Sequence, residues 1–121
     1  MAHEIEGLDL SFTSRTSWKA EVTCPGKPTV VVPVTWSNAC RREGGSLLQT
    51  VWFKNPKELE AHRTRAEPFV VAVAEPANPG ERPAVFKRFN TLFRVQSTGR
   101  KVDDECIETK VLERVNARNW P

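Results

Sequence analysis

Residues 29–36 read TVVVPVTW and residues 69–74 read FVVAVA, and these two stretches decide the fold class. In the first, a large apolar residue falls at every second position from Val30 to Trp36, which is the spacing of one face of an extended strand. Pro33 lies on the opposite face and has no amide hydrogen to donate, which predicts an edge position or a bulge. The second stretch is a continuous apolar run, typical of a strand buried on both faces. A sheet is therefore the expected framework.

Shorter signals extend this sheet on both sides. Nine prolines and six glycines cut the chain into short segments, which favours strands over long helices. A polar loop is expected at 37–46 and a turn containing Gly99 at 97–104. The alternation of polar and apolar residues, or a cluster of apolar residues, predicts further strands at 8–13, 18–23, 47–54, 84–96 and 106–115.

One helix is predicted, over residues 56–65. Asn55 can cap its first turn, and Pro56 suits the first helical position because proline has no amide hydrogen to leave unpaired. The helix should end before Pro68, since the residue that precedes a proline avoids the helical conformation. A helix of this length is not stable alone, so we expect it to pack on the sheet through Leu59.

The length and composition indicate a single domain over residues 1–121, mainly β with one short α-helix. A sheet of this size loses its exposed edges best by curling, so a small β-barrel is expected. The tail at 116–121 is expected to be flexible, with Trp120 as a residue that can dock.

The sequence contains no recognised catalytic or metal-binding motif, so we predict a non-enzymatic protein without a metal or cofactor. His62 is expected to be an exposed helix residue. The three cysteines, Cys24, Cys40 and Cys106, lie far apart, which argues against a disulfide framework and indicates the cytoplasm; one disulfide with one free thiol is the alternative. No apolar run of membrane-spanning length occurs, so no membrane partner is expected.

The charges are segregated along the chain, although the net charge is only +3. Six basic residues and no acidic residue lie between positions 82 and 101, whereas five acidic residues lie between 103 and 113. Such segregation can produce a positive patch that attracts polyanions. The alternative is that the two stretches lie side by side and neutralise each other.

The predicted strand at 84–96 has two different faces. One face carries Phe93 and Val95 and suits a core, while the other carries Phe86, Arg88, Asn90, Leu92 and Arg94. Planar rings stack on unpaired bases, and guanidinium groups contact phosphates. Trp52 offers another ring beside a cation, with a place in the core as the alternative. The predicted nucleic-acid-binding residues are Trp52, Lys54, Phe86, Arg88, Asn90, Arg94 and, at loop tips, Arg41, Arg42, Arg100 and Lys101.

The stretch at 29–77 resembles the OB-fold of bacterial single-stranded DNA-binding proteins, including the primosomal PriB type. It reads TVVVPVTW, a polar hairpin with two arginines, LLQTVWFKN, the helix PKELEAH and then FVVAVAEPA. The resemblance implies an OB-like barrel over about residues 18–115, in which Trp52, Phe86 and the hairpin arginines contact the nucleic acid. This chain departs from the family in ending with ARNWP instead of an acidic tail, and in having two strand-like pieces before Cys24.

Three functions are compatible with these features. The first is a single-stranded DNA- or RNA-binding protein that works as a homodimer. The second is a protein-interaction module, such as an inhibitor or assembly factor of a phage or mobile element. The third is a small-barrel nuclease or toxin that depends on Arg88, Arg94 or His62.

Overall fold

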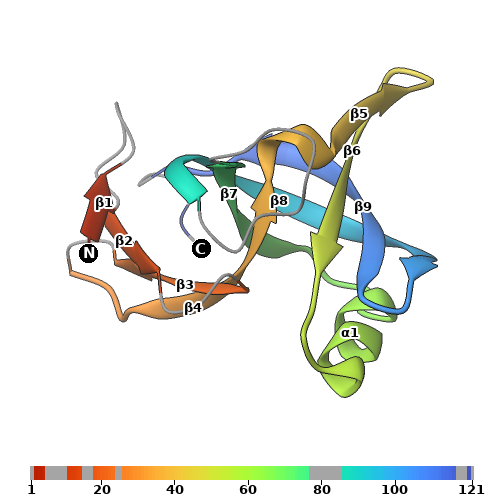
Figure 1. Ribbon diagram of the computed structural model, residues 1–121, viewed down its shortest axis with the longest axis horizontal. Coiled ribbons are helices and arrows are strands. Elements are labelled where there is room, and N and C mark those ends of the chain that lie inside the picture. The colour runs from red at the N-terminus through yellow and green to blue at the C-terminus, as the bar shows by residue number, and fades with distance from the viewer. Residues whose placement is uncertain are drawn as a thin grey trace.

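The computed structural model describes residues 2–4, 11–14, 18–23, 26–76, 86–116 and 120, and for 2–4, 11–14, 76 and 86–90 it describes the backbone alone. Most of this part of the chain is in strands, and the prediction of a mainly β fold with one short α-helix is confirmed (Figure 1). The strands are β1 (Ala2–Glu4), β2 (Ser11–Ser14), β3 (Lys19–Thr23), β4 (Val30–Trp36), β5 (Cys40–Glu43), β6 (Ser46–Trp52), β7 (Phe69–Pro76), β8 (Phe86–Asp103) and β9 (Cys106–Arg114). The helices are a 3-10 turn, η1 (Ser37–Ala39), and α1 (Pro56–Arg63).

The described strands form one sheet in the order β1-β2-β3-β4-β7-β8-β9-β6-β5. Every neighbouring pair is antiparallel except β4 and β7, which are parallel. The sheet is strongly curved, and α1 lies below β6 and β9 (Figure 1). The curvature brings β4 near β6, where the Gln49 Nε2 donates to Thr35 Oγ1 at 3.0 Å and to the Trp36 carbonyl at 2.9 Å. Side chains thus join the two strands, and no ladder closes a barrel within the described residues.

Pro33 marks the point where β4 changes partner. Residues 30–33 of β4 pair with β3, whereas residues 34–36 pair with β7. The amide of Val34 still donates to the Trp18 carbonyl at 2.8 Å, so the change occurs within one residue. A proline fits here because each half of the strand is an edge on one side, and the missing amide leaves no ladder bond broken. The predicted edge position is therefore correct in this local sense.

The sheet separates two hydrophobic clusters, and β7 contributes to both. Val70, Ala72 and Ala74 lie in one cluster with Trp36 and Leu92, and we call it the outer cluster. The alternate residues of β7 belong to the inner cluster, which the helix covers. Its buried members are Val51, Phe53, Leu59, Phe69, Val71, Val73, Val95 and Ile107. The continuous apolar run that the sequence shows is explained by burial on both faces.

The C-terminal Trp120 docks in the outer cluster, where it is 3% exposed. Its carbonyl accepts a hydrogen bond of 2.6 Å from Lys27 Nζ. The indole supplies a large apolar surface that covers the sheet face containing Leu92. Of the two outcomes considered for this residue, docking is the one observed.

Two connections differ from the sequence expectation. Arg41 and Arg42 lie in β5, not at a loop tip, because Gly44 and Gly45 make the reversal with φ values of 57° and 82°. β8 continues through Gly99, which adopts a φ of 87° within a register shift, so the predicted turn at 97–104 is wrong. A left-handed glycine in a strand accommodates a bulge without reversing the chain.

The predicted helix cap is present, and its removal has a definite expected cost. Asn55 Oδ1 accepts a hydrogen bond of 2.8 Å from the Lys57 amide at the start of α1. Asn55→Ala should lower the free energy of unfolding by about 1 kcal/mol, because one amide loses its partner. Urea denaturation measures this. The control is Asn38→Ala, an exposed residue in η1, which should change stability by less than about 0.5 kcal/mol. Equal effects of the two substitutions would contradict the assignment.

In the described part of the chain, no helix is long and apolar enough to cross a membrane.

Candidate nucleic-acid interface

The basic and acidic stretches of the sequence lie side by side, because β8 and β9 pair in antiparallel fashion. Three ion pairs result: Arg94 with Glu113 at 2.7 Å, Arg100 with Glu108 at 3.1 Å, and Lys101 with Asp104 at 3.5 Å. The acidic residues therefore neutralise these three cations, as the second alternative stated. The three cations do not form an unpaired positive stripe along β8. The exposed Lys101–Asp104 pair contributes only about 0–1 kcal/mol, whereas the Arg100 pair involves the buried carboxylate of Glu108.

Two arginines from distant parts of the sequence converge on Glu108. Arg41 Nη2 from β5 and Arg100 Nη1 from β8 donate to the same Oε2 atom, at 2.8 Å and 3.1 Å. The hydroxyl of Thr98 donates to Oε1 at 3.1 Å, and Glu108 itself is 9% exposed. We call Arg41, Thr98, Arg100 and Glu108 the Glu108 cluster. It has the donor set of an anion-binding site, with a carboxylate of the protein in the anion position.

Further cations flank the Glu108 cluster. Lys110 is paired with Leu48 across β9 and β6, and Leu48 is paired with Arg41 across β6 and β5. Lys110 and Arg41 therefore lie on one face, about 10 Å apart as two inter-strand spacings. Arg42 follows Arg41 in the edge strand and is exposed, but its side chain points to the opposite face of β5. Within the described residues, neither Arg42 nor Lys110 forms an ion pair; Arg41 has a second carboxylate partner, Glu43, at 3.2 Å.

The aromatic part of the predicted interface is less open than the sequence suggested. Trp52 shares the outer face of β6 with Thr50 but is half-buried and packs against the outer cluster. Lys54 is exposed just after this strand. The side chains of Phe86, Arg88 and Asn90 lie outside the described residues, although their backbone belongs to β8.

The predicted face of β8 contains a buried residue in its middle. Leu92 is fully buried in the outer cluster, so this face is covered at that point. Phe93 and Val95 pack in the inner cluster, as expected. Arg94 is removed from the Glu108 cluster, since it lies at the other end of the β8–β9 ladder. The structure therefore brings together Arg41 and Arg100, places Arg42 on the opposite face of β5, and separates Arg94 from the cluster.

Sequence reasoning did not find Glu108, Thr98 or Lys110. One signal was available: Glu108 stands between Ile107 and Thr109, which are both fully buried, so its carboxylate falls on the other face of β9. What it meets there depends on the register with β5 and β8, which no local pattern specifies.

His62 is half-buried and not an exposed helix residue. Its ring stacks on Phe53 with centroids 4.6 Å apart and meets Phe69 edge-on at 4.9 Å. Its Nδ1 lies 2.8 Å from the Glu58 carbonyl, which fixes the ring orientation. The ring thus serves to join the helix to the sheet.

Cys40 and Cys106 are free thiols, and Cys24 lies outside the described residues. Burial, followed by the nearby Asp103 carboxylate, raises the pKa of Cys106 to about 12. Burial also raises the pKa of Cys40, against a smaller opposite effect of Arg42. Both thiols are therefore held in the protonated, poorly nucleophilic form at neutral pH.

In comparisons with protein-family models, with curated proteins and with solved structures, no match to this chain was found.

Proposed function

We propose that this protein binds single-stranded nucleic acid through phosphate contacts at the Glu108 cluster and the adjacent cation Lys110. The observation that supports this proposal is the convergence of two guanidinium groups on one oxygen of Glu108. An arginine carries five N–H donors, and each of these arginines directs a single one of its donors to that oxygen. Phosphate oxygens have the charge and geometry to accept from the donors that face solvent.

The charge balance of this region favours an anion. Arg41 and Arg100 pair with the carboxylates of Glu43 and Glu108, and Lys110 lies on the same face. Three cations against two acids leave a local excess of positive charge in a protein with net charge +3. The proposal depends on phosphates and not on stacking, because Trp52 packs against the outer cluster. A binder of this kind has little base preference.

The proposal predicts a strong salt dependence, measured by fluorescence anisotropy with a labelled oligothymidylate. Between 50 mM and 200 mM salt, affinity should fall roughly 20- to 50-fold, as expected for three or four phosphate contacts to a single strand. Absence of binding at 50 mM salt would refute the proposal. A denaturing gel of the recovered oligonucleotide tests the nuclease alternative, which requires cleavage.

A charge-matched pair of double variants locates the site. Arg100→Ala with Lys110→Ala removes two exposed cations from the proposed surface, and should weaken binding about tenfold and flatten the salt slope. Lys57→Ala with Arg65→Ala removes the same charge from α1 and the loop after it, and should leave the affinity within about twofold. Equal losses in both variants would indicate a general charge effect and exclude this surface as the site.

One observation favours the protein-interaction alternative. β5 ends the sheet order, so its outer edge presents unpaired backbone groups within the described structure. Such an edge can accept a strand from a partner. In a centred antiparallel homodimer the arginines of the two copies would face each other, which favours an acidic foreign strand over a second copy. This alternative predicts no oligonucleotide binding even at low salt.

A further inference from the structure

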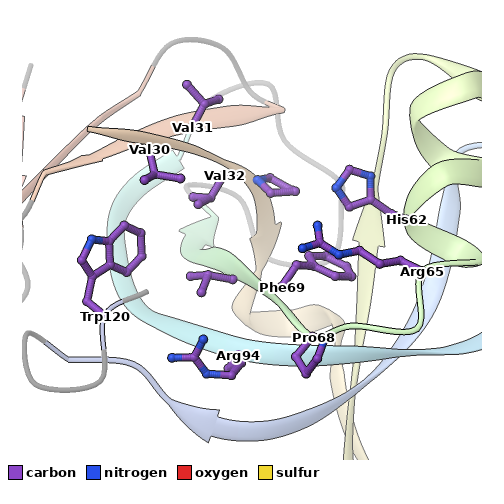
Figure 2. Close-up of a pocket in the computed structure, with 11 residues that line it drawn as sticks. Val30, Val31, Val32, His62, Arg65, Pro68, Phe69, Arg94 and Trp120 are labelled. Atoms are coloured by element: carbon purple, nitrogen blue, oxygen red, sulfur yellow. The ribbon is translucent and has the colours of Figure 1, made fainter. Parts of the chain in front are cut away.

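A pocket lies between β4 and β7, where the two strands diverge. The strands pair only where Val34–Trp36 faces Ala72–Ala74. Before that point, β4 follows β3 and the start of β7 follows β8, so the two chains separate. The resulting pocket has a volume of about 360 Å³, within the range of small-molecule sites. Figure 2 shows the valines of β4 on one side, Trp120 on another and Phe69 opposite.

Most of the pocket wall is apolar. Residues from β4, from the continuous stretch 68–70 that leads into β7, and from the C-terminus supply it, so three separate segments meet there. Val31 is 44% exposed on the rim, while Val32 and Trp120 are almost fully buried. The apolar lining residues are Val30, Val31, Val32, Pro33, Pro68, Phe69, Val70 and Trp120. A hydrocarbon group placed here would be removed from water on several sides.

The polar lining is basic. Arg65, Arg94 and His62 complete the lining, which contains no carboxylate among the described residues (Figure 2). The guanidinium carbon of Arg65 lies 5.9 Å from the centroid of the Phe69 ring, so one cation stands directly over the apolar wall. Two described acids act from outside the lining: Glu113 pairs with Arg94 at 2.7 Å, and Glu67 lies 3.9 Å from Arg65.

We propose that this pocket binds a small organic anion that combines an apolar body with a single carboxylate group. The valines, Phe69 and Trp120 hold the apolar body, and the carboxylate lies between Arg65 and Arg94. An uncharged molecule of the same shape loses the arginine contacts, and a cation is repelled by them. The pocket shares no residue with the Glu108 cluster, so this proposal does not depend on nucleic-acid binding.

Isothermal titration at constant ionic strength tests the ligand class with three probes: octanoate, octanol and octylammonium. Octanoate should bind about tenfold more tightly than octanol, and octylammonium should bind most weakly. In amide NMR spectra, octanoate should shift Val31, Val70 and the Trp120 indole signal. Equal affinities for the three probes, or shifts confined to other residues, would overturn the proposal.

Two exposed-site variants of opposite direction separate binding from misfolding. Arg65→Gln removes one cation of the pocket and should weaken octanoate binding about fivefold. Glu113→Gln removes the carboxylate that competes for Arg94 and should strengthen it about threefold, a gain that unfolding cannot produce. Arg42→Gln is the matched control, because Arg42 lies outside the pocket, and should have no effect. An unchanged affinity in either pocket variant would refute the arrangement.

Discussion

Leu92→Ala should lower the free energy of unfolding by about 2–5 kcal/mol, the range for truncating a large buried aliphatic residue. Leu92 is fully buried and belongs to the outer cluster, where Trp36, Val70 and Trp120 also lie. The alanine would leave a cavity that these neighbours cannot fill, because they belong to different strands and to the C-terminus. Urea denaturation followed by circular dichroism gives the difference directly.

The matched control is Leu112→Ala in the neighbouring strand β9. Leu112 is 47% exposed, so its truncation should change stability by less than about 0.5 kcal/mol. The comparison tests whether this face of β8 is buried, since on a solvent-exposed face both substitutions would change the free energy of unfolding only slightly. Two losses within 0.5 kcal/mol of each other would show that the outer cluster does not form in solution.

Leu92 also shows what a strand pattern can and cannot predict. Alternation correctly separates Phe93 and Val95 from Leu92 and Arg94, because successive side chains of a strand point to opposite faces. Whether the second face meets solvent depends on segments far away in sequence, here β3, β4 and Trp120. The local alternation of residues therefore does not show whether distant segments bury the second face.

The signals that succeeded are local ones. The Asn55 cap, the helix start at Pro56 and the strand at 69–74 each depend on residues within one turn or one strand. The position of the reversal between β8 and β9 was predicted wrongly because a glycine such as Gly99 is typical of turns. The reversal instead follows Asp103, whose Oδ1 accepts hydrogen bonds from the amides of Glu105 and Cys106 at 2.7 Å and 3.1 Å.

The candidate site was predicted in part, for the same reason. Arginines at 41, 42 and 100 are visible in the sequence, and the structure brings Arg41 and Arg100 together while Arg42 points to the opposite face of β5. Their acidic partner Glu108 is set by strand register across β5, β6, β9 and β8, including the shift between Ser97 and Lys101. A register shift changes which charges meet, so the ion pairs could not be assigned from residue spacing alone.

Raising the pH from 8 to 10.5 should lower the free energy of unfolding of the native protein by about 2 kcal/mol more than that of the Cys106→Ala variant. The cause is the buried thiol of Cys106, which is 2% exposed and has a pKa raised from 9.0 to about 12 by burial and by the Asp103 carboxylate. In the unfolded chain the thiol ionises near its ordinary pKa, whereas in the folded protein it keeps its proton. The folded state therefore binds more protons above pH 9, and stability falls there as the pH rises.

The experiment compares unfolding free energies at the two pH values for both proteins, so that other titrating groups, including the second described thiol Cys40, cancel in the difference. The contribution of Cys106 is complete below about pH 9 and is lost progressively up to about pH 12, which fixes both the sign and the window of the effect. The alanine variant can be less stable at pH 8 because it loses a packed sulfur atom, and this constant offset does not alter the comparison. Parallel pH profiles for the two proteins would mean that the Cys106 thiol reaches water in the folded state, which would contradict its burial.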